Sequence, residues 1–150
     1  MRESIGATWI FSICLTFIVL FTAYLAISVN YAKAFKIKNH IVTRIEENEG
    51  YNQTLEQELS SYLISQGYSA YNTCPDYSED SWEKWGCINP QNGNENQCGA
   101  CIYRMGTSSN IDNQAYYRVV SFFKFDLPVI SYITTFKIKG ESKTIYDYAN

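Results

Sequence analysis

The chain has 150 residues, enough for one domain rather than two. Aromatic residues make up 16% of it, charged residues make up 18%, and the formal net charge is -3. This mildly acidic balance excludes the basic footprint that a nucleic-acid-binding protein carries. Composition therefore indicates one small domain, rich in aromatic packing, with no nucleic-acid partner.

An uncharged apolar run extends from Thr8 to Val29. As a helix it would be about 33 Å long, enough to cross the hydrocarbon core of a bilayer. Trp9 and Tyr31 stand near its two ends, where aromatic rings favour the membrane interface. A cleaved signal peptide is the alternative, but it has a shorter apolar core followed by a small-residue cleavage site. We therefore predict that residues 1–29 hold a retained transmembrane anchor.

The helical pattern continues beyond the anchor. Ile37, Ile41 and Ile45 recur at four-residue intervals, which gives one apolar stripe. No proline interrupts the pattern, and Gly50 is placed to cap its end. We predict one continuous helix whose second part, residues 30–49, is an amphipathic stem of the domain formed by residues 30–150.

A second, shorter helix is predicted over residues 52–66. Its leucines repeat on one face, and Gly67 is placed to end it. Asn52 or Thr54 can cap its start, because a side-chain oxygen there accepts from a free backbone N–H group.

The main strands are predicted within residues 116–147. The sequences YYRVVSFFKFDL (116–127) and YITTFKIKG (132–140) alternate apolar and polar residues, which is typical of an antiparallel sheet with one covered face and one solvated face. Residues 67–113 are predicted to form a loop region rich in cysteine and aromatic residues. The expected fold class is α+β, with the small sheet packed on the stem and the second helix.

Five cysteines are present, and Cys14 within the anchor is best interpreted as a small apolar filler. The other four lie in a loop-rich stretch of 28 residues, the pattern of a disulfide-stapled exported domain. A zinc site normally has two close pairs, and a redox couple needs a thiol at a helix N-terminus; only Cys98 and Cys101 are closely spaced, in a strand-like context. We predict disulfides and no metal. Three connectivities are open, and the hairpin-like CINPQNGNENQC favours Cys87–Cys98 together with Cys74–Cys101.

Two signals in the sequence predict opposite membrane topologies. Lys33, Lys36, Lys38 and Arg44 follow the anchor, and the positive-inside rule would place the domain in the cytoplasm. Disulfides persist outside the cytoplasm instead. We predict a single-pass membrane protein with an extracytoplasmic C-terminal domain.

No motif of an enzyme is found, and the chain has one histidine, so neither catalysis nor a cofactor is expected. Acidic residues in one loop, Asp76, Glu79, Asp80 and Glu83, lack the spacing of a calcium loop and are expected to be solvated. The tyrosines and tryptophans between positions 68 and 85 are expected to pack in the domain rather than to bind a ligand. No small-molecule substrate is predicted.

An apolar N-terminal helix that runs into an amphipathic stem, followed by a small antiparallel sheet, resembles the plan of pilins and pseudopilins. The ending RVVSFFKFDLPVISYITTFKIKGESKTIYD is similar to that of TadE-like proteins of tight-adherence (Flp-type) pilus systems. The resemblance covers about the first 50 and last 35 residues. It implies a structural or accessory subunit of a bacterial pilus or secretion system, whose partners are membrane lipid, other pilin-like subunits and assembly proteins.

Two details refine this expectation. The family's processing site has Glu five residues after Gly, whereas Phe11 follows Gly6 at that distance, so we expect an unprocessed N-terminus. The sequence LPVISYI between the last strands holds Pro128, Val129 and Ile130, where a hairpin normally uses Asn, Asp or Gly. These three residues either fold onto the core or form an interaction surface.

The alternative function is a membrane-tethered binding module or, less favoured, a zinc or redox protein.

Overall fold

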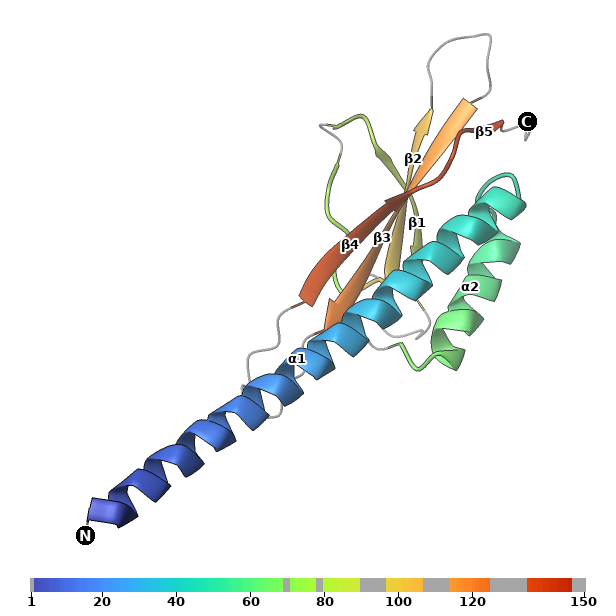
Figure 1. Ribbon diagram of the computed structural model, residues 1–150. Helices are drawn as coiled ribbons and strands as arrows, with labels where there is room; N and C mark the ends of the chain where they lie inside the picture. Colours follow the sequence, from blue (N-terminus) through green and yellow to red (C-terminus); the bar gives the residue numbers. More distant parts are fainter. Residues whose placement is uncertain are drawn as a thin grey trace.

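The computed structural model describes residues 2–68, 71–77, 80–89, 97–106, 114–124 and 135–146. These residues form a long helix, a short helix and an antiparallel sheet (Figure 1). The elements are α1 (Arg2–Glu47), α2 (Gln53–Ser65), β1 (Glu83–Ile88), β2 (Ala100–Gly106), β3 (Gln114–Lys124), β4 (Thr135–Glu141) and β5 (Ile145–Tyr146). The predicted α+β class is confirmed.

The predicted continuous helix is confirmed by α1, which has 46 residues. Its N-terminal part projects away from the rest of the chain, and its C-terminal part lies along the sheet (Figure 1). The helix ends with the Gly50 N–H donating to the Ile45 carbonyl at 3.0 Å. The left-handed residue of this cap is Glu49, with φ of 53°, and not the predicted Gly50. Gly50 follows with φ of 147°, so two successive residues have positive φ and the first of them is not a glycine, which strains Glu49.

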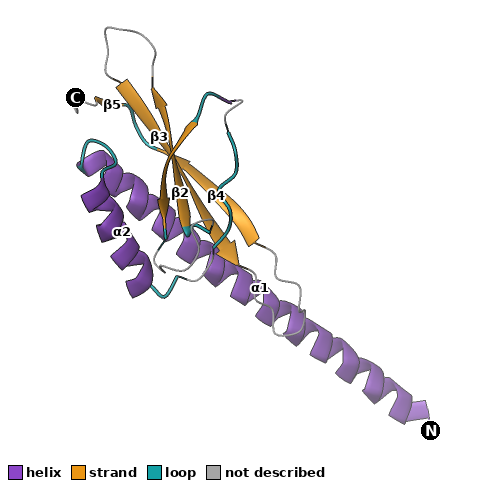
Figure 2. Cartoon of the chain, turned by 180° about the vertical axis from the view of Figure 1, so that it is seen from behind, coloured by secondary structure: helices purple, strands orange, loops and turns teal. Residues whose placement is uncertain are grey.

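The second helix is also confirmed, and Asn52 rather than Thr54 caps it. The Asn52 side-chain oxygen accepts from the Leu55 N–H at 2.8 Å, and Gly67 ends the helix with φ of 57°. Helix α2 lies beside α1 and runs back along it (Figure 2). The ring of His40 stacks on Tyr62 with centroids 3.9 Å apart. The apolar face of α2 is formed by Leu55, Leu59 and Leu63, all buried.

The sheet has the strand order β1-β2-β3-β4, and β5 pairs with the beginning of β3. All of these pairs are antiparallel. Strands β1 and β2 lie in the region predicted as loop, which is a correction. Their sequences do not alternate, because a bulge at Trp85 interrupts β1 and residues 100–103 are buried on both faces. Strand β3 begins at Gln114, two residues before the predicted start.

One face of the sheet packs against α1. The odd-numbered residues of β3 point to this face, and the hydroxyl group of Ser121 donates to the Ala34 carbonyl at 3.5 Å. Strand β4 approaches so closely that a Cβ atom on Gly140 would lie 2.5 Å from the Lys38 side chain. The core on this face includes Ala34, Ile37, Ile41, Ile45, Ile102, Tyr117, Val119 and Ile138. The stem therefore covers the sheet as predicted.

The opposite face is covered at its centre, which corrects the prediction of a solvated face there, whereas Lys137 and Lys139 on β4 are exposed as predicted. The even-numbered residues Val120 and Phe122 of β3 have no exposed surface. Cys101 and Tyr103, which pair with β3 at Val120 and Arg118, point to the same side. Residues 71–77 cross this face and bury it. The alternation of the sequence reports which side a residue takes, but it cannot show that a loop folds over the polar side.

Candidate functional site: the exposed helix and the disulfide-clamped face

The first half of α1 is apolar and has no protein cover among the described residues. The most apolar 18-residue window of the helix is 0% buried, and the helix is long enough to cross a membrane. Polar hydroxyl groups within it are satisfied locally, since Thr16 donates to the Ser12 carbonyl and Thr22 to the Val19 carbonyl, both at 2.9 Å. The exposed large side chains include Trp9, Ile10, Phe11, Phe17, Ile18, Leu20, Phe21, Tyr24, Leu25 and Val29.

Small residues form a stripe along this exposed half, and a shallow groove follows its beginning. Thr8, Ser12 and Thr16 line the groove together with larger residues such as Phe17 and Leu20. Spacing of three or four residues places side chains on one helix face. This spacing leads from Thr8 through Ser12, Thr16, Val19, Ala23, Ala26 and Asn30 to Ala34, Ile37, Ile41 and Ile45. The small-residue stripe therefore continues the face that the sheet covers.

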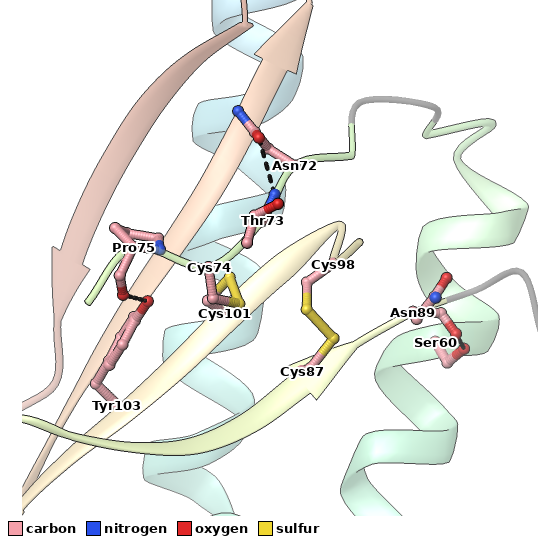
Figure 3. The surroundings of a disulfide bond; sticks show 10 residues. All are labelled: Ser60, Asn72, Thr73, Cys74, Pro75, Cys87, Asn89, Cys98, Cys101 and Tyr103. Atoms are coloured by element: carbon pink, nitrogen blue, oxygen red, sulfur yellow. Dashed lines mark hydrogen bonds between the residues drawn. A yellow bond between two sulfur atoms is a disulfide. The ribbon is translucent and has the colours of Figure 1, made fainter. Parts of the chain in front are cut away.

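The predicted disulfide pairing is confirmed. Cys74 is bonded to Cys101 and Cys87 to Cys98, with Cα atoms 5.8 Å and 5.4 Å apart (Figure 3). Cys87–Cys98 closes the hairpin of β1 and β2, whereas Cys74–Cys101 ties the crossing segment to the middle of the sheet. Cys14 is the free cysteine of the described residues.

Further contacts hold residues 71–77 on the sheet. Asn72 and Cys98 exchange two backbone hydrogen bonds, of 3.1 Å and 2.9 Å. The Tyr103 hydroxyl donates to the Pro75 carbonyl (Figure 3), and burial raises the pKa of this phenol. The ring of Tyr77 meets Tyr103 edge to face at 5.0 Å.

Cationic side chains complete this cover. The Arg118 guanidinium lies 4.1 Å from the ring centroid of Trp82, and the Lys139 ammonium lies 4.4 Å from that of Tyr77. Arg118 also binds Glu141 at 2.7 Å. These stacked pairs give Tyr77 and Trp82 packing roles in the cover.

The sulfur atoms are close enough together to raise the question of a metal. Those of Cys74, Cys98 and Cys101 lie within 4.8 Å of one another. A zinc site requires thiolates, and all three sulfurs are held in disulfides. Within the described part of the chain, no acidic cluster suited to a metal accompanies them. Glu79 of the acidic loop lies outside the described residues.

The predicted interaction surface of Pro128, Val129 and Ile130 also lies outside the described residues. The strand ends that flank it, Lys124 and Thr135, are paired to each other at the end of the sheet nearest the exposed part of α1. Whether these three residues contact a partner stays a prediction.

Two lysines that follow the anchor have roles in the folded domain. The Lys33 ammonium donates to the Gly67 carbonyl at 3.1 Å, and the Lys38 ammonium lies 4.2 Å from the ring centroid of Phe35. Gly67 ends α2, and a lysine at a helix C-terminus, as Lys33 is here, is favoured by the helix dipole. Domain packing therefore accounts for two of the charges that oppose an extracytoplasmic location.

An aromatic cluster that the sequence did not predict lies at the end of the sheet nearest the exposed helix. Phe123 meets Tyr31 edge to face at 5.8 Å and stacks on Phe136 at 5.1 Å. Tyr31 also stacks on Phe35 at 6.3 Å. The signal that could have found it is the placement of aromatic residues at strand ends close to an anchor.

Comparison with protein-family models, with curated proteins and with solved structures finds no match to this chain. The functional interpretation therefore depends on the architecture itself.

Proposed function

We propose that this protein is a membrane-anchored subunit, of the minor pilin or pseudopilin kind, in a bacterial pilus or related secretion assembly. It acts by association with other subunits and not by catalysis. The observation that carries this proposal is the division of α1 into an exposed apolar half and a half buried under an antiparallel sheet. Such a helix holds its domain at one membrane surface and leaves the apolar half free for lipid and neighbouring helices.

The small-residue stripe supports association within the membrane. Helices pack in lipid where small residues let their backbones approach closely. Thr8, Ser12 and Thr16 provide such a surface, and it lies on the side of α1 that carries the sheet. A neighbouring helix on the stripe would therefore lie beneath the domain of this subunit, which couples packing in the membrane to packing above it.

The disulfides support a location outside the cytoplasm. Two bridges in a small domain are typical of exported proteins, because the cytoplasm keeps thiols reduced. The positive-inside rule opposes this location through the lysines after the anchor. We give the bridges more weight, since contacts within the domain engage both Lys33 and Lys38.

The test is photo-crosslinking in native membranes. A photoreactive residue is placed at Thr16, on the stripe, and in a second variant at Ile18, which is 59% exposed. The two positions differ in depth by about 3 Å but point to opposite sides of the helix. We expect a discrete protein adduct from position 16 and lipid adducts from position 18.

Lipid adducts alone from position 16 would contradict association through this face. That result would favour the alternative of a membrane-tethered binding module, which works through its domain and needs no helix partner.

A further inference from the structure

The aromatic cluster of Tyr31, Phe35, Phe123 and Phe136 is only partly covered by protein. Phe136 is 44% exposed, Tyr31 is 49% exposed and Phe35 is 43% exposed. Three successive ring contacts, Phe35–Tyr31, Tyr31–Phe123 and Phe123–Phe136, join the helix to the outer strand of the sheet. The cluster is thus a continuous surface at one end of the domain.

The position of this surface along α1 follows from two lengths. Gly140 of β4 lies against the Lys38 side chain, and Phe136, four residues earlier, is about 13 Å nearer the exposed half of the helix. Tyr31 precedes Lys38 by about 10 Å along the helix. Phe136 and Tyr31 therefore lie at nearly the same position along the axis of α1. Tyr31 is about 3 Å beyond Val29, the end of the apolar run, which is within the headgroup layer of a bilayer.

Positive charge accompanies the aromatic rings. Lys124 and Lys137 belong to the same strand ends but point to the opposite face of the sheet from Phe123 and Phe136. Lys36 is exposed on the helix between Tyr31 and the core. Among the described residues, α1 has no carboxylate from position 6 to position 45, and β3 has none along its length. The described acidic residues of the domain, such as Glu46, Glu56 and Glu141, lie further along α1, α2 and β4.

We propose that this end of the domain, with the aromatic cluster on one face of the sheet and Lys124 and Lys137 on the other, docks on anionic phospholipid headgroups of the membrane that holds α1. This inference rests on the proposed function, because it requires α1 to span that membrane. The amphipathic ring of Tyr31 favours the interfacial layer, and phenylalanine rings insert at the boundary between headgroups and acyl chains. Lysines near this layer attract anionic lipid. A protein partner suits the surface less well, since the centre of a protein interface is depleted in lysine.

Docking would fix the domain relative to the bilayer. A single helix leaves its domain free to tilt relative to the bilayer. A second contact, at the strand ends, would hold the sheet on the membrane surface and restrict this tilt. The small-residue stripe of α1 would then keep a constant orientation beneath the sheet.

The experiment uses the full chain in vesicles of phosphatidylcholine, with and without phosphatidylglycerol. A photoreactive residue replaces Phe136, Leu25 or Tyr146 in three variants. Leu25 is 50% exposed within the anchor, and Tyr146 is 52% exposed on β5, at the opposite end of β3 from Phe136. We expect lipid adducts at positions 136 and 25 and none at 146. The adduct at 136 should increase with phosphatidylglycerol and decrease at high salt.

The lysines supply the second arm. In vesicles with phosphatidylglycerol, Lys137→Gln should lower the adduct at position 136 about fivefold and leave that at 25 unchanged, because one lysine contributes about a factor of five to binding an anionic surface. The side chains of Phe136 and Lys137, the two residues replaced in this double variant, are exposed. Both disulfides should therefore still form, and the intact mass verifies this.

The outcomes separate the two proposals. An adduct at position 25 with none at 136 overturns the docking surface and leaves the anchor in place. Loss of both adducts overturns the anchor and with it the proposed function. A protein adduct at 136 in place of lipid, or a yield that ignores lipid charge, also overturns lipid docking.

Discussion

Truncation of Phe122 tests whether the second face of the sheet is buried. Phe122 is fully buried on the face that residues 71–77 cross. Replacing such a phenylalanine by alanine removes its burial and leaves a cavity, so Phe122→Ala should lower the free energy of unfolding by about 3–5 kcal/mol. A solvated face, as the alternation alone suggests, would lower it by less than about 1 kcal/mol.

Phe136→Ala is the matched control, because Phe136 is 44% exposed and opens to solvent. With about half of its side chain buried and no enclosed cavity, it should cost about 1–1.5 kcal/mol. Urea unfolding of the detergent-solubilised full chain measures both, with Trp82 and Trp85 of the domain as fluorescent reporters. Equal losses in the two variants would refute burial of the second face.

Three further predictions concern stability and use the same unfolding measurement. Glu49→Gly should raise the free energy of unfolding by about 1 kcal/mol, because glycine relieves the left-handed strain at φ of 53°; a loss would contradict the cap geometry. Replacing Cys74 and Cys101 together by alanine should cost about 3.5 kcal/mol, since their bridge spans 27 residues, and an unchanged midpoint would show that it does not form. Burial, and then the charge of Arg44, lowers the pKa of His40 below 6.5, so the folded state favours the neutral ring. Stability should be full above about pH 6.5 and decline as the pH falls through the folded pKa, and His40→Gln should remove that step; persistence of the step would contradict its assignment.

The sequence was most informative where one periodicity runs without interruption. The apolar run of residues 8–29 and the stripe of Ile37, Ile41 and Ile45, with no proline in either, were together sufficient to predict α1. Asparagine at position 52 and glycine at position 67 marked the ends of α2. The asparagine side chain accepts from a free backbone N–H, and glycine adopts a positive φ without the clash of a Cβ atom. These signals are local, because the start and end of a helix depend on residues that are close together in the sequence.

The missed features depend on contacts between distant segments. Strands β1 and β2 carry no clean alternation, because β2 is buried on both faces and Trp85 forms a bulge. Ring contacts such as Tyr31–Phe123 join residues 92 positions apart, and no spacing along the chain encodes them. The disulfide pairing was predictable because Cys87 and Cys98 flank one hairpin, which left only one choice for the other two.

The redox state of the cysteines in living cells tests most directly whether the domain lies beyond the membrane. Cells are quenched in acid, free thiols are alkylated with one reagent, and bridged thiols are reduced and alkylated with a heavy isotope form. We predict the light label on Cys14 alone and the heavy label on Cys74, Cys87, Cys98 and Cys101. Light label on all five would place the domain in a reducing compartment and contradict the proposed extracytoplasmic location.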